Sequence, residues 1–186
     1  MSADQDPAPP GYRIRPARPA DAAVLRRFGA QLLDETPFFL RGPEERAADD
    51  AEMAGVIRSF EGASGAAMMN AWVVRADGSE GPPVGEGVLI PGRLQRTRRT
   101  AVVGVGVLRA HWGRGLGRAL MAAVERRAQA AGLIRLELTV FEPNDRAQRL
   151  YERLGYGREG TKRRSVELPG RGLIDEILMA KLLDEG

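Results

Sequence analysis

The sequence contains no cysteine and only one histidine, His111. The lack of cysteine excludes disulfide bonds, zinc sites built on thiolates and a cysteine nucleophile. His111 could be considered as a base, but it comes just before a glycine-rich segment, where a solvated loop residue is the simpler interpretation. We therefore expect chemistry without a metal, and any thiol must come from a ligand.

Long apolar runs are also missing, because charge or glycine interrupts every hydrophobic stretch. A transmembrane helix needs roughly 20 consecutive apolar residues, so we expect no membrane span. Residues 1–11 lack the basic start and apolar run of a signal peptide, and their prolines indicate a disordered tail. The expectation is a cytoplasmic protein with one folded domain over residues 12–186.

Charge of one sign is not in large excess, since 28 lysine and arginine residues face 25 acids, for a net charge of +3. A broad nucleic-acid-binding face is therefore not indicated, and nucleic acid is not an expected partner. The cluster of arginines at 93–99 is an exception that could contact an acidic partner. A solvated hairpin tip is the simpler interpretation of that cluster.

Hydrophobic residues make up 43% of the chain, enough for a substantial core in one domain. Their spacing predicts α/β order around a single sheet. The predicted helices cover residues 21–36, 43–60, 118–131 and 145–154. The predicted strands cover residues 12–15, 71–75, 84–90, 101–108, 133–141, 166–168 and 176–180.

A glycine-rich turn joins the most apolar strand to the helix that follows it: Gly113-Arg114-Gly115-Leu116-Gly117. Such a turn presents unpaired backbone N–H groups and the positive end of a helix to one point, which suits a phosphate. Glycine lets the backbone approach closely and adopt left-handed torsions. The alternative is a tight strand-to-helix connection without a ligand, and the turn alone does not decide between the two.

Two other phosphate-binding motifs do not fit this turn. A P-loop requires Lys and then Ser or Thr after its last glycine, but Arg118 and Ala119 follow Gly117. A dinucleotide-binding fingerprint requires a third glycine at a position where Arg118 or Leu120 stands. Nucleoside triphosphates and dinucleotides are therefore poorer candidates.

The stretch from Val105 to Gly155 resembles the GNAT superfamily of N-acetyltransferases. The family turn, Arg/Gln-x-x-Gly-x-Gly/Ala, is matched by residues 112–117, with Trp112 in place of Arg or Gln. A second family segment, N-x-x-A-x-x-L-Y-x-x-x-G-F, is matched by residues 144–156. The resemblance implies a single domain with a mixed, mostly antiparallel sheet of six to seven strands flanked by about four helices.

The resemblance also implies that acetyl-CoA is the cosubstrate and that an amine accepts the acetyl group. Tyr151 matches the family tyrosine that protonates the departing thiolate, although its spacing also fits a core aromatic. Asn144 matches a position that contacts the cofactor, and it is equally an ordinary helix N-cap. The expected cofactor-binding residues are Val105, Gly106, Val107, Gly113, Arg114, Gly115, Leu116, Gly117, Arg118 and Asn144.

The general base is not assigned by the sequence. Family members often carry a glutamate on the central strand, but residues 101–107 contain no acid. Glu86, Glu35 or a chain of waters could take its place, and each glutamate is more commonly structural. The acceptor is expected to be selected by the segment 35–42, where Phe38 and Phe39 could line a site or simply pack.

Three functions fit the sequence. The first is direct acetyl transfer from acetyl-CoA to a primary amine of a small molecule, protein or peptide. The second is a non-catalytic acyl-CoA-binding regulatory module, because the strand carboxylate is missing. The third is an acetyltransferase associated with RNA or ribosomes, based on the arginines at 93–99. A homodimer is compatible with each of them.

Overall fold

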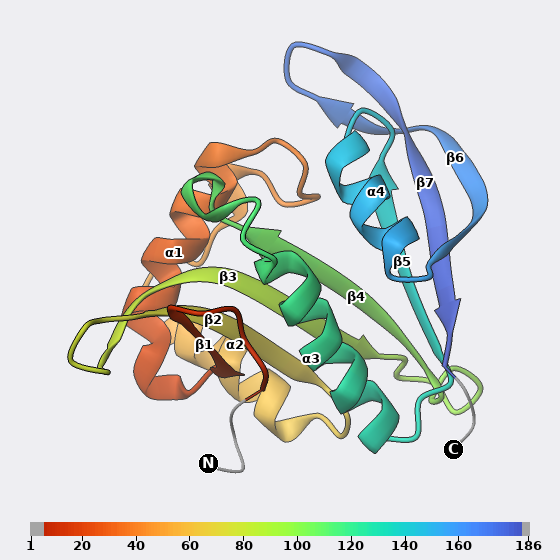
Figure 1. Cartoon of the computed structure of the whole chain (residues 1–186). Coiled ribbons are helices and arrows are strands. Elements are labelled where there is room, and N and C mark those ends of the chain that lie inside the picture. The colour runs from red at the N-terminus through yellow and green to blue at the C-terminus, as the bar shows by residue number, and fades with distance from the viewer. Residues whose placement is uncertain (1–5, 184–186) are drawn as a thin grey trace.

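The computed structural model describes residues 6–183, which contain seven strands and four α-helices around one sheet (Figure 1). The elements follow one another in the order β1 (Tyr12–Pro16), α1 (Ala22–Glu35), α2 (Asp50–Gly62), β2 (Ala67–Val74), β3 (Glu80–Pro91), β4 (Thr100–Val107), α3 (Leu116–Ala130), β5 (Arg135–Phe141), α4 (Asp145–Arg153), β6 (Gly157–Leu168) and β7 (Gly172–Leu182). Single turns of 3₁₀ helix cover Pro19–Asp21, Pro43–Glu45 and Arg109–His111.

The strands lie in the order β1-β2-β3-β4-β5-β7-β6. All neighbours are antiparallel except β4 and β5, which are parallel. Parallel neighbours need a crossover connection, and α3 supplies it. The expected fold class, a mixed and mostly antiparallel sheet flanked by four helices, is confirmed.

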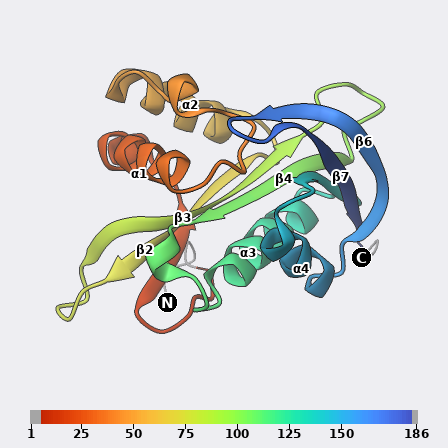
Figure 2. The same ribbon diagram turned by 90° about the horizontal axis from the view of Figure 1, so that it is seen from above.

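The helices cover both faces of the sheet: α1 and α2 on one face, α3 and α4 on the other (Figure 2). α3 approaches β3 closely because Gly85 and Gly87 carry no side chain there. A Cβ atom would lie 2.9 Å from Leu120 at Gly85 and 3.1 Å from Val124 at Gly87. These two glycines therefore set the distance at which α3 crosses the sheet.

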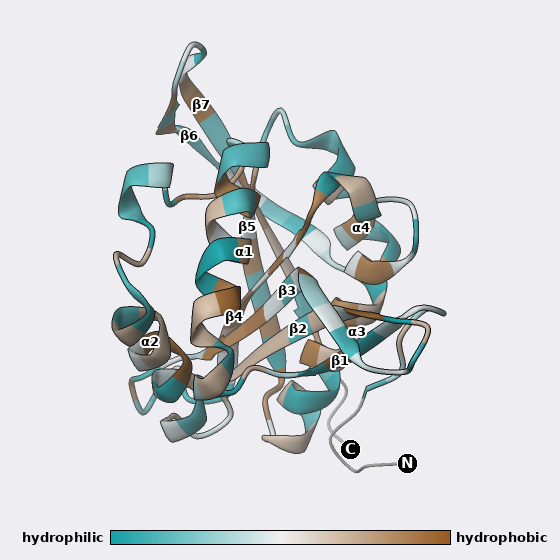
Figure 3. Ribbon diagram, turned by 90° about the vertical axis from the view of Figure 1, so that its left-hand side faces the viewer, coloured by the Kyte–Doolittle hydropathy of each residue, from teal (hydrophilic) through white to brown (hydrophobic). Residues whose placement is uncertain are grey.

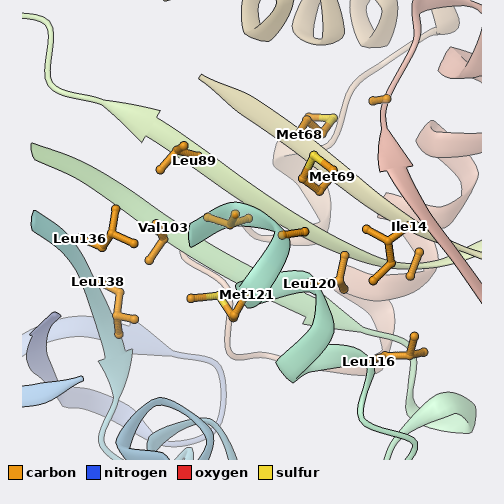
Figure 4. Packing of buried hydrophobic residues seen from close by; sticks show 14 of the residues in the cluster. Ile14, Met68, Met69, Leu89, Val103, Leu116, Leu120, Met121, Leu136 and Leu138 are labelled. Carbon is orange, nitrogen blue, oxygen red and sulfur yellow. The ribbon is translucent and has the colours of Figure 1, made fainter. Parts of the chain in front are cut away.

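The core lies on both faces of the central strands, and each helix turns a hydrophobic band toward it (Figure 3). α3 contributes much of this core, because apolar residues recur at helical spacing along its buried side. None of the helices within residues 6–183 has the length and apolar character needed to cross a membrane. Figure 4 shows part of this packing, with α3 residues Leu116, Leu120 and Met121 beside Leu89, Val103, Leu136 and Leu138 of the sheet.

Residues 6–11 differ from the expected disordered tail, because they lie against the domain. The Asp6 N–H donates to the Ile14 carbonyl at 3.1 Å, and the Val74 N–H donates to the Gly11 carbonyl at 2.9 Å. The Asp6 carboxylate accepts two bonds from the Arg126 guanidinium, at 2.7 and 2.9 Å. Backbone pairing and an ion pair thus hold a segment whose prolines indicated disorder; residues 1–5 lie outside the described part.

The second helix begins later than predicted. Pro43 and its two following acids form only a 3₁₀ turn, and α2 begins at Asp50. The Asp49 side chain caps it by accepting from the Glu52 N–H at 2.8 Å. Pro43–Glu45 and the start of α2 both carry acids that suit the positive end of a helix. Only the start of α2 is followed by buried apolar residues at helical spacing.

The last two strands are much longer than the predicted segments 166–168 and 176–180. β6 is the edge strand of the sheet, and nearly all of its residues are exposed. It therefore lacks the alternation of apolar and polar residues that marks a half-buried strand. The hairpin of β6 and β7 projects beyond the rest of the domain (Figures 1 and 3).

Candidate active site

β4 and β5 separate soon after they meet. Their parallel pairing is limited to Thr100–Val102 against Arg135–Glu137, and the remainder of β4 pairs only with β3. Figure 1 shows the two strands diverging from this point. The sheet therefore opens into a V, and one edge of the second half of β4 is left without a partner strand.

The register of β3 and β4 determines which backbone groups face this opening. The Leu108 N–H donates to the Val84 carbonyl at 2.9 Å, so Leu108 directs its backbone toward β3. Backbone groups alternate along an antiparallel ladder, so Gly106 also faces β3. Val105 and Val107 consequently direct their N–H and C=O groups into the opening.

The opening is the entrance to a cleft of about 1340 Å³. Its walls come from α1 and α2, the segment between them, parts of β2, β3 and β4, the first turn of α3, the end of β5 and α4. Of the residues predicted to bind the cofactor or to act on it, only Arg114 is absent from this wall. Those on the wall are Val105, Gly106, Val107, Gly113, Gly115, Leu116, Gly117, Arg118, Asn144 and Tyr151.

The glycine turn has the geometry that its sequence predicted. Gly113 and Gly115 adopt φ angles of 76° and 80°, in the left-handed region that penalises other residues. The Ala119 N–H makes the first α-helical bond of α3, to the Gly115 carbonyl. The three preceding N–H groups, of Leu116, Gly117 and Arg118, are therefore left for a ligand at the positive end of the helix.

Trp112 has a role that the sequence did not reveal. Its indole N–H donates to the Val107 carbonyl at 2.7 Å, so this acceptor at the end of the open edge is already satisfied. The guanidinium of Arg146, from the first turn of α4, lies 4.3 Å from the centre of the indole ring. The residue that replaces the family's Arg or Gln thus joins the glycine turn to α4 across the cleft.

Tyr151 lies on the buried side of α4 and is 5% exposed. Burial raises its pKa to about 12, so its hydroxyl group is protonated at neutral pH. Its ring meets the Tyr156 ring edge-on, with centroids 5.8 Å apart. The core role and the position on the cleft wall, which the sequence left as alternatives, are therefore both present.

Asn144 caps α4, because its side-chain oxygen accepts from the Ala147 N–H at 3.2 Å. This observation confirms the N-cap interpretation. The residue also lines the cleft, so a contact between its side-chain amide and a ligand stays a prediction. The N-cap fixes the start of α4 and thereby the position of Tyr151 two turns later.

Of the base candidates that the sequence offers, Glu35 has both carboxylate oxygens in hydrogen bonds. One accepts from the Arg109 N–H at 2.6 Å and the other from the Gln31 amide at 2.9 Å. His111 is on the cleft wall, with its Nδ1 atom 2.9 Å from the Tyr12 hydroxyl oxygen. Burial and, to a smaller extent, the Arg114 charge lower the pKa of His111. Glu86 lies in the cleft, and burial raises its pKa.

Phe38 and Phe39 line the cleft on the side of α1, as the acceptor-site hypothesis requires. Phe39 also packs against the core, and its ring occupies the space beside Gly106. Within residues 6–183 no group of His, Asp and Glu side chains could hold a metal ion. The site thus combines an open strand edge, a glycine turn with free N–H groups, a buried phenol and a half-buried carboxyl.

The sequence profile of the Acetyltransferase (GNAT) family matches residues 30–156. The protein is therefore an acyltransferase, and more specifically an acetyltransferase of the GNAT family, to which this chain belongs. The matched segment contains β4, the glycine turn, α3 and α4, which form most of the cleft. No curated protein matches the sequence significantly.

Solved structures share the fold over nearly the whole chain. A GNAT-family acetyltransferase from Streptococcus pneumoniae is 27% identical with a TM-score of 0.84, covering 92% of this chain and 99% of its own. YncA from Salmonella typhimurium, solved with its cofactor acetyl-CoA, is 22% identical with a TM-score of 0.79, covering 95% and 96%. A phosphinothricin acetyltransferase from Sinorhizobium meliloti, in complex with acetyl-CoA, is 20% identical with a TM-score of 0.77, covering 95% and 90%.

Proposed function

We propose that this acetyltransferase transfers the acetyl group of acetyl-CoA directly to a primary amine of a small molecule, protein or peptide. The observation that carries the proposal is the unpaired edge of β4, which ends at the glycine turn within one cleft. An extended molecule with amide groups can pair with Val105 as an added strand would, while its phosphates reach the start of α3. The pantetheine arm and pyrophosphate of CoA have this arrangement of groups.

The chain offers two kinds of contact to the donor. The N–H groups of Leu116, Gly117 and Arg118 bind the pyrophosphate, and the charges of Arg114 and Arg118 favour it from nearby. Val105 and Val107 offer backbone groups to the arm, although the Val107 carbonyl already accepts from Trp112. Gly106 directs its backbone to β3, so its contribution is the space that a missing side chain leaves.

Tyr151 acts on the sulfur as it departs. With a pKa of about 12 the hydroxyl group is a donor at neutral pH and not a base. Because a thiol has a pKa near ~8.5, the proton is held more tightly by the phenol than by a free thiolate. Tyr151 therefore stabilises the developing negative charge by a hydrogen bond, and passes its proton only as the C–S bond breaks. A backbone N–H of β4 stabilises the carbonyl oxygen.

An unbiased turnover screen tests this function. The purified full chain is incubated with acetyl-CoA and separate libraries of amino acids, polyamines, aminoglycosides and peptides with free N-termini. Release of CoA and a product heavier by one acetyl group, found by mass spectrometry, are the expected results. Tight binding of CoA without acetylation of any amine would instead favour the acyl-CoA-binding module.

A cytoplasmic location and an association with RNA are two further proposals. The cytoplasmic location fits a soluble donor such as acetyl-CoA, and fractionation of the cells that make the protein would test it. The arginines at 93–99 lie in the hairpin between β3 and β4, at the opposite end of β4 from the glycine turn. Polynucleotide binding that weakens steeply with salt would be the mark of an RNA-associated enzyme.

A further inference from the structure

Glu86 lines the cleft from β3, the neighbour of the central strand β4 on which family members often carry a glutamate. Glu86 on β3 lies opposite Asn70 on β2 and Gly106 on β4. Directly opposed residues of antiparallel strands share a face of the sheet, so these three form a row on the α1 side. β4 itself offers no acid on this face, where Val102, Gly104 and Gly106 stand.

Glu86 is held in this position without a cationic partner. Among residues 6–183 no lysine, arginine or histidine nitrogen lies within salt-bridge distance of its carboxylate. Burial raises its pKa, and the Asn70 amide and the more distant Arg41 charge oppose this effect only partly. Glu86 is half-buried in the cleft wall and has no paired cation there, so a cationic group that enters the cleft can pair with its carboxylate.

Glycine on β4 keeps the approach to Glu86 open. A Cβ atom at Gly104 would have only one neighbour outside its own strand within 4 Å, Val88 at 3.4 Å. At Gly106 the corresponding space is taken by Leu32 and Phe39, each 2.7 Å from where a Cβ atom would lie. A ligand that reaches across β4 from its open edge therefore passes over Gly104, with Phe39 as a wall.

Most of the other charged groups on the cleft wall either form an ion pair already or lie on elements across the cleft from Glu86. Arg26 pairs with Asp50 at 2.6 Å, and Arg46 pairs with Asp34 at 3.1 Å. Arg41 also lies on the wall, and its charge favours the ionised form of Glu86. The remaining charged or titratable groups on the wall are His111 after β4, Arg118 on α3, and Asp145, Arg146, Arg149, Tyr151 and Arg153 on α4.

We propose that Glu86 binds the ammonium form of the acceptor and removes its proton. This inference rests on the proposed function, because it needs an amine as the acceptor. The aromatic wall of Phe38 and Phe39 and the neighbouring methionines Met53 and Met68 suit an acceptor whose amine is carried on an apolar body. Highly charged polyamines fit this subsite less well.

The proton balance of the reaction is complete with these groups. Glu86 takes one proton from the ammonium ion, and the neutral amine forms the C–N bond with the acetyl carbonyl carbon. As the C–S bond breaks, the sulfur takes the Tyr151 proton, and the second proton of the amine restores Tyr151 through solvent. Glu86 then releases its proton to water, so each acetylation yields one amide, one thiol and one proton.

The test compares Glu86→Gln with Glu167→Gln, a substitution of the same type at an exposed position of β6 outside the cleft. With the best amine from the screen, we expect Glu86→Gln to lower kcat/KM at pH 7 by about 100-fold or more, the usual size of general-base catalysis. The loss should shrink as pH rises toward the pKa of the free amine, near ~10.4 for an alkylamine. Glu167→Gln should match the wild-type protein throughout.

Two results separate failure of the inference from failure of the function. If wild type acetylates an amine and Glu86→Gln keeps its rate and pH profile, Glu86 is not the base and the function stands. The second measurement needs no acceptor: a ¹³C NMR titration of the glutamate carboxyls, assigned by the spectrum of Glu86→Gln. Burial predicts a pKa of Glu86 above the ordinary range, and a carboxyl still protonated at pH 7, which cannot take a proton, would overturn the proposal.

Discussion

At the scale of single residues, Trp112 shows how one departure from a family pattern is accommodated. A side chain that could have bound phosphate is replaced by one that binds the protein itself, at Val107 and Arg146. The indole is 38% exposed, so its outer face also remains available at the mouth of the cleft. Under the proposed function, anion binding at the turn would then fall to backbone N–H groups, with the charges of Arg114 and Arg118 nearby.

Replacement of Tyr151 tests its role as the donor to sulfur. Tyr151→Phe removes only the hydroxyl oxygen and keeps the ring that packs against Tyr156. We expect kcat to fall by about 100-fold, while the Kd of acetyl-CoA measured by calorimetry changes little. The matched control is Tyr12→Phe, which removes a hydroxyl group that contacts His111 outside α4. Equal kcat for wild type and Tyr151→Phe, with chemistry rate-limiting, would contradict the assignment.

The residues that sequence reasoning found are those whose role depends on local chain geometry. Gly113 and Gly115 could be placed because only glycine suits left-handed torsions before a helix, and Asn144 because an N-cap is a local motif. Glu86 could be named but not chosen, since its value depends on Asn70 and Gly106, which are distant in sequence. The partners of Trp112 could not be inferred for the same reason.

At the scale of elements, β4 combines a buried ladder with an open edge, and its glycines divide the tasks. Gly104 leaves open space beside its β3 partner Val88, whereas Gly106 admits Leu32 of α1 and Phe39. Gly104 thus keeps the cleft open, and Gly106 allows α1 to pack closely on the sheet. Substitution of each by alanine separates these two effects.

Gly106→Ala should destabilise the domain, because the new methyl group would lie 2.7 Å from both Leu32 and Phe39. Overpacking of this kind costs about 1–3 kcal/mol of the free energy of unfolding, which urea denaturation measures. Gly104→Ala is the matched control, since its nearest atom lies at 3.4 Å and its stability should be close to that of wild type. Equal destabilisation of both variants would show that loss of glycine itself, and not the contact, is responsible.

Elements with a buried and an exposed side were predicted well, and those without this contrast were not. α3 and β5 begin within two residues of the predicted positions, because apolar residues recur at helical or strand spacing. β6 is exposed along nearly its whole length, so the spacing carries no information. The start of α2 was misplaced because Pro43 with two acids resembles a helix start as closely as Asp49 does.

At the scale of the whole molecule, the N-terminal segment ties the first strand to α3. Asp6 contacts Ile14 through its backbone and Arg126 through its side chain, so it links β1 to α3. A second arginine, Arg127, lies 3.7 Å from the same carboxylate. The Asp6 side chain is 10% exposed, which shields the pair from water more than a surface ion pair.

Removal of this charge tests whether the segment stabilises the domain. Asp6→Asn should lower the free energy of unfolding by about 1 kcal/mol at low salt, with a smaller difference at ~1 M salt because the pair is screened. Glu61→Gln, which neutralises an exposed acid near the end of α2, is the control for loss of one negative charge. A salt-independent or absent effect of Asp6→Asn would show that the backbone bonds alone hold the segment.

Under the proposed function, the short ladder between β4 and β5 makes the stability of the fold depend on the concentration of acetyl-CoA. Three residue pairs join the two halves of the sheet, and the fold leaves the remaining strand contacts unmade. Under the proposed function, a donor bound between β4 and α4 would supply contacts in their place, and at a hundredfold excess over its Kd it would add about 2.7 kcal/mol to the free energy of unfolding. The lifetime of the enzyme in a cell would then follow acetyl-CoA abundance, because a starved cell holds more of the chain in its less stable, protease-sensitive form.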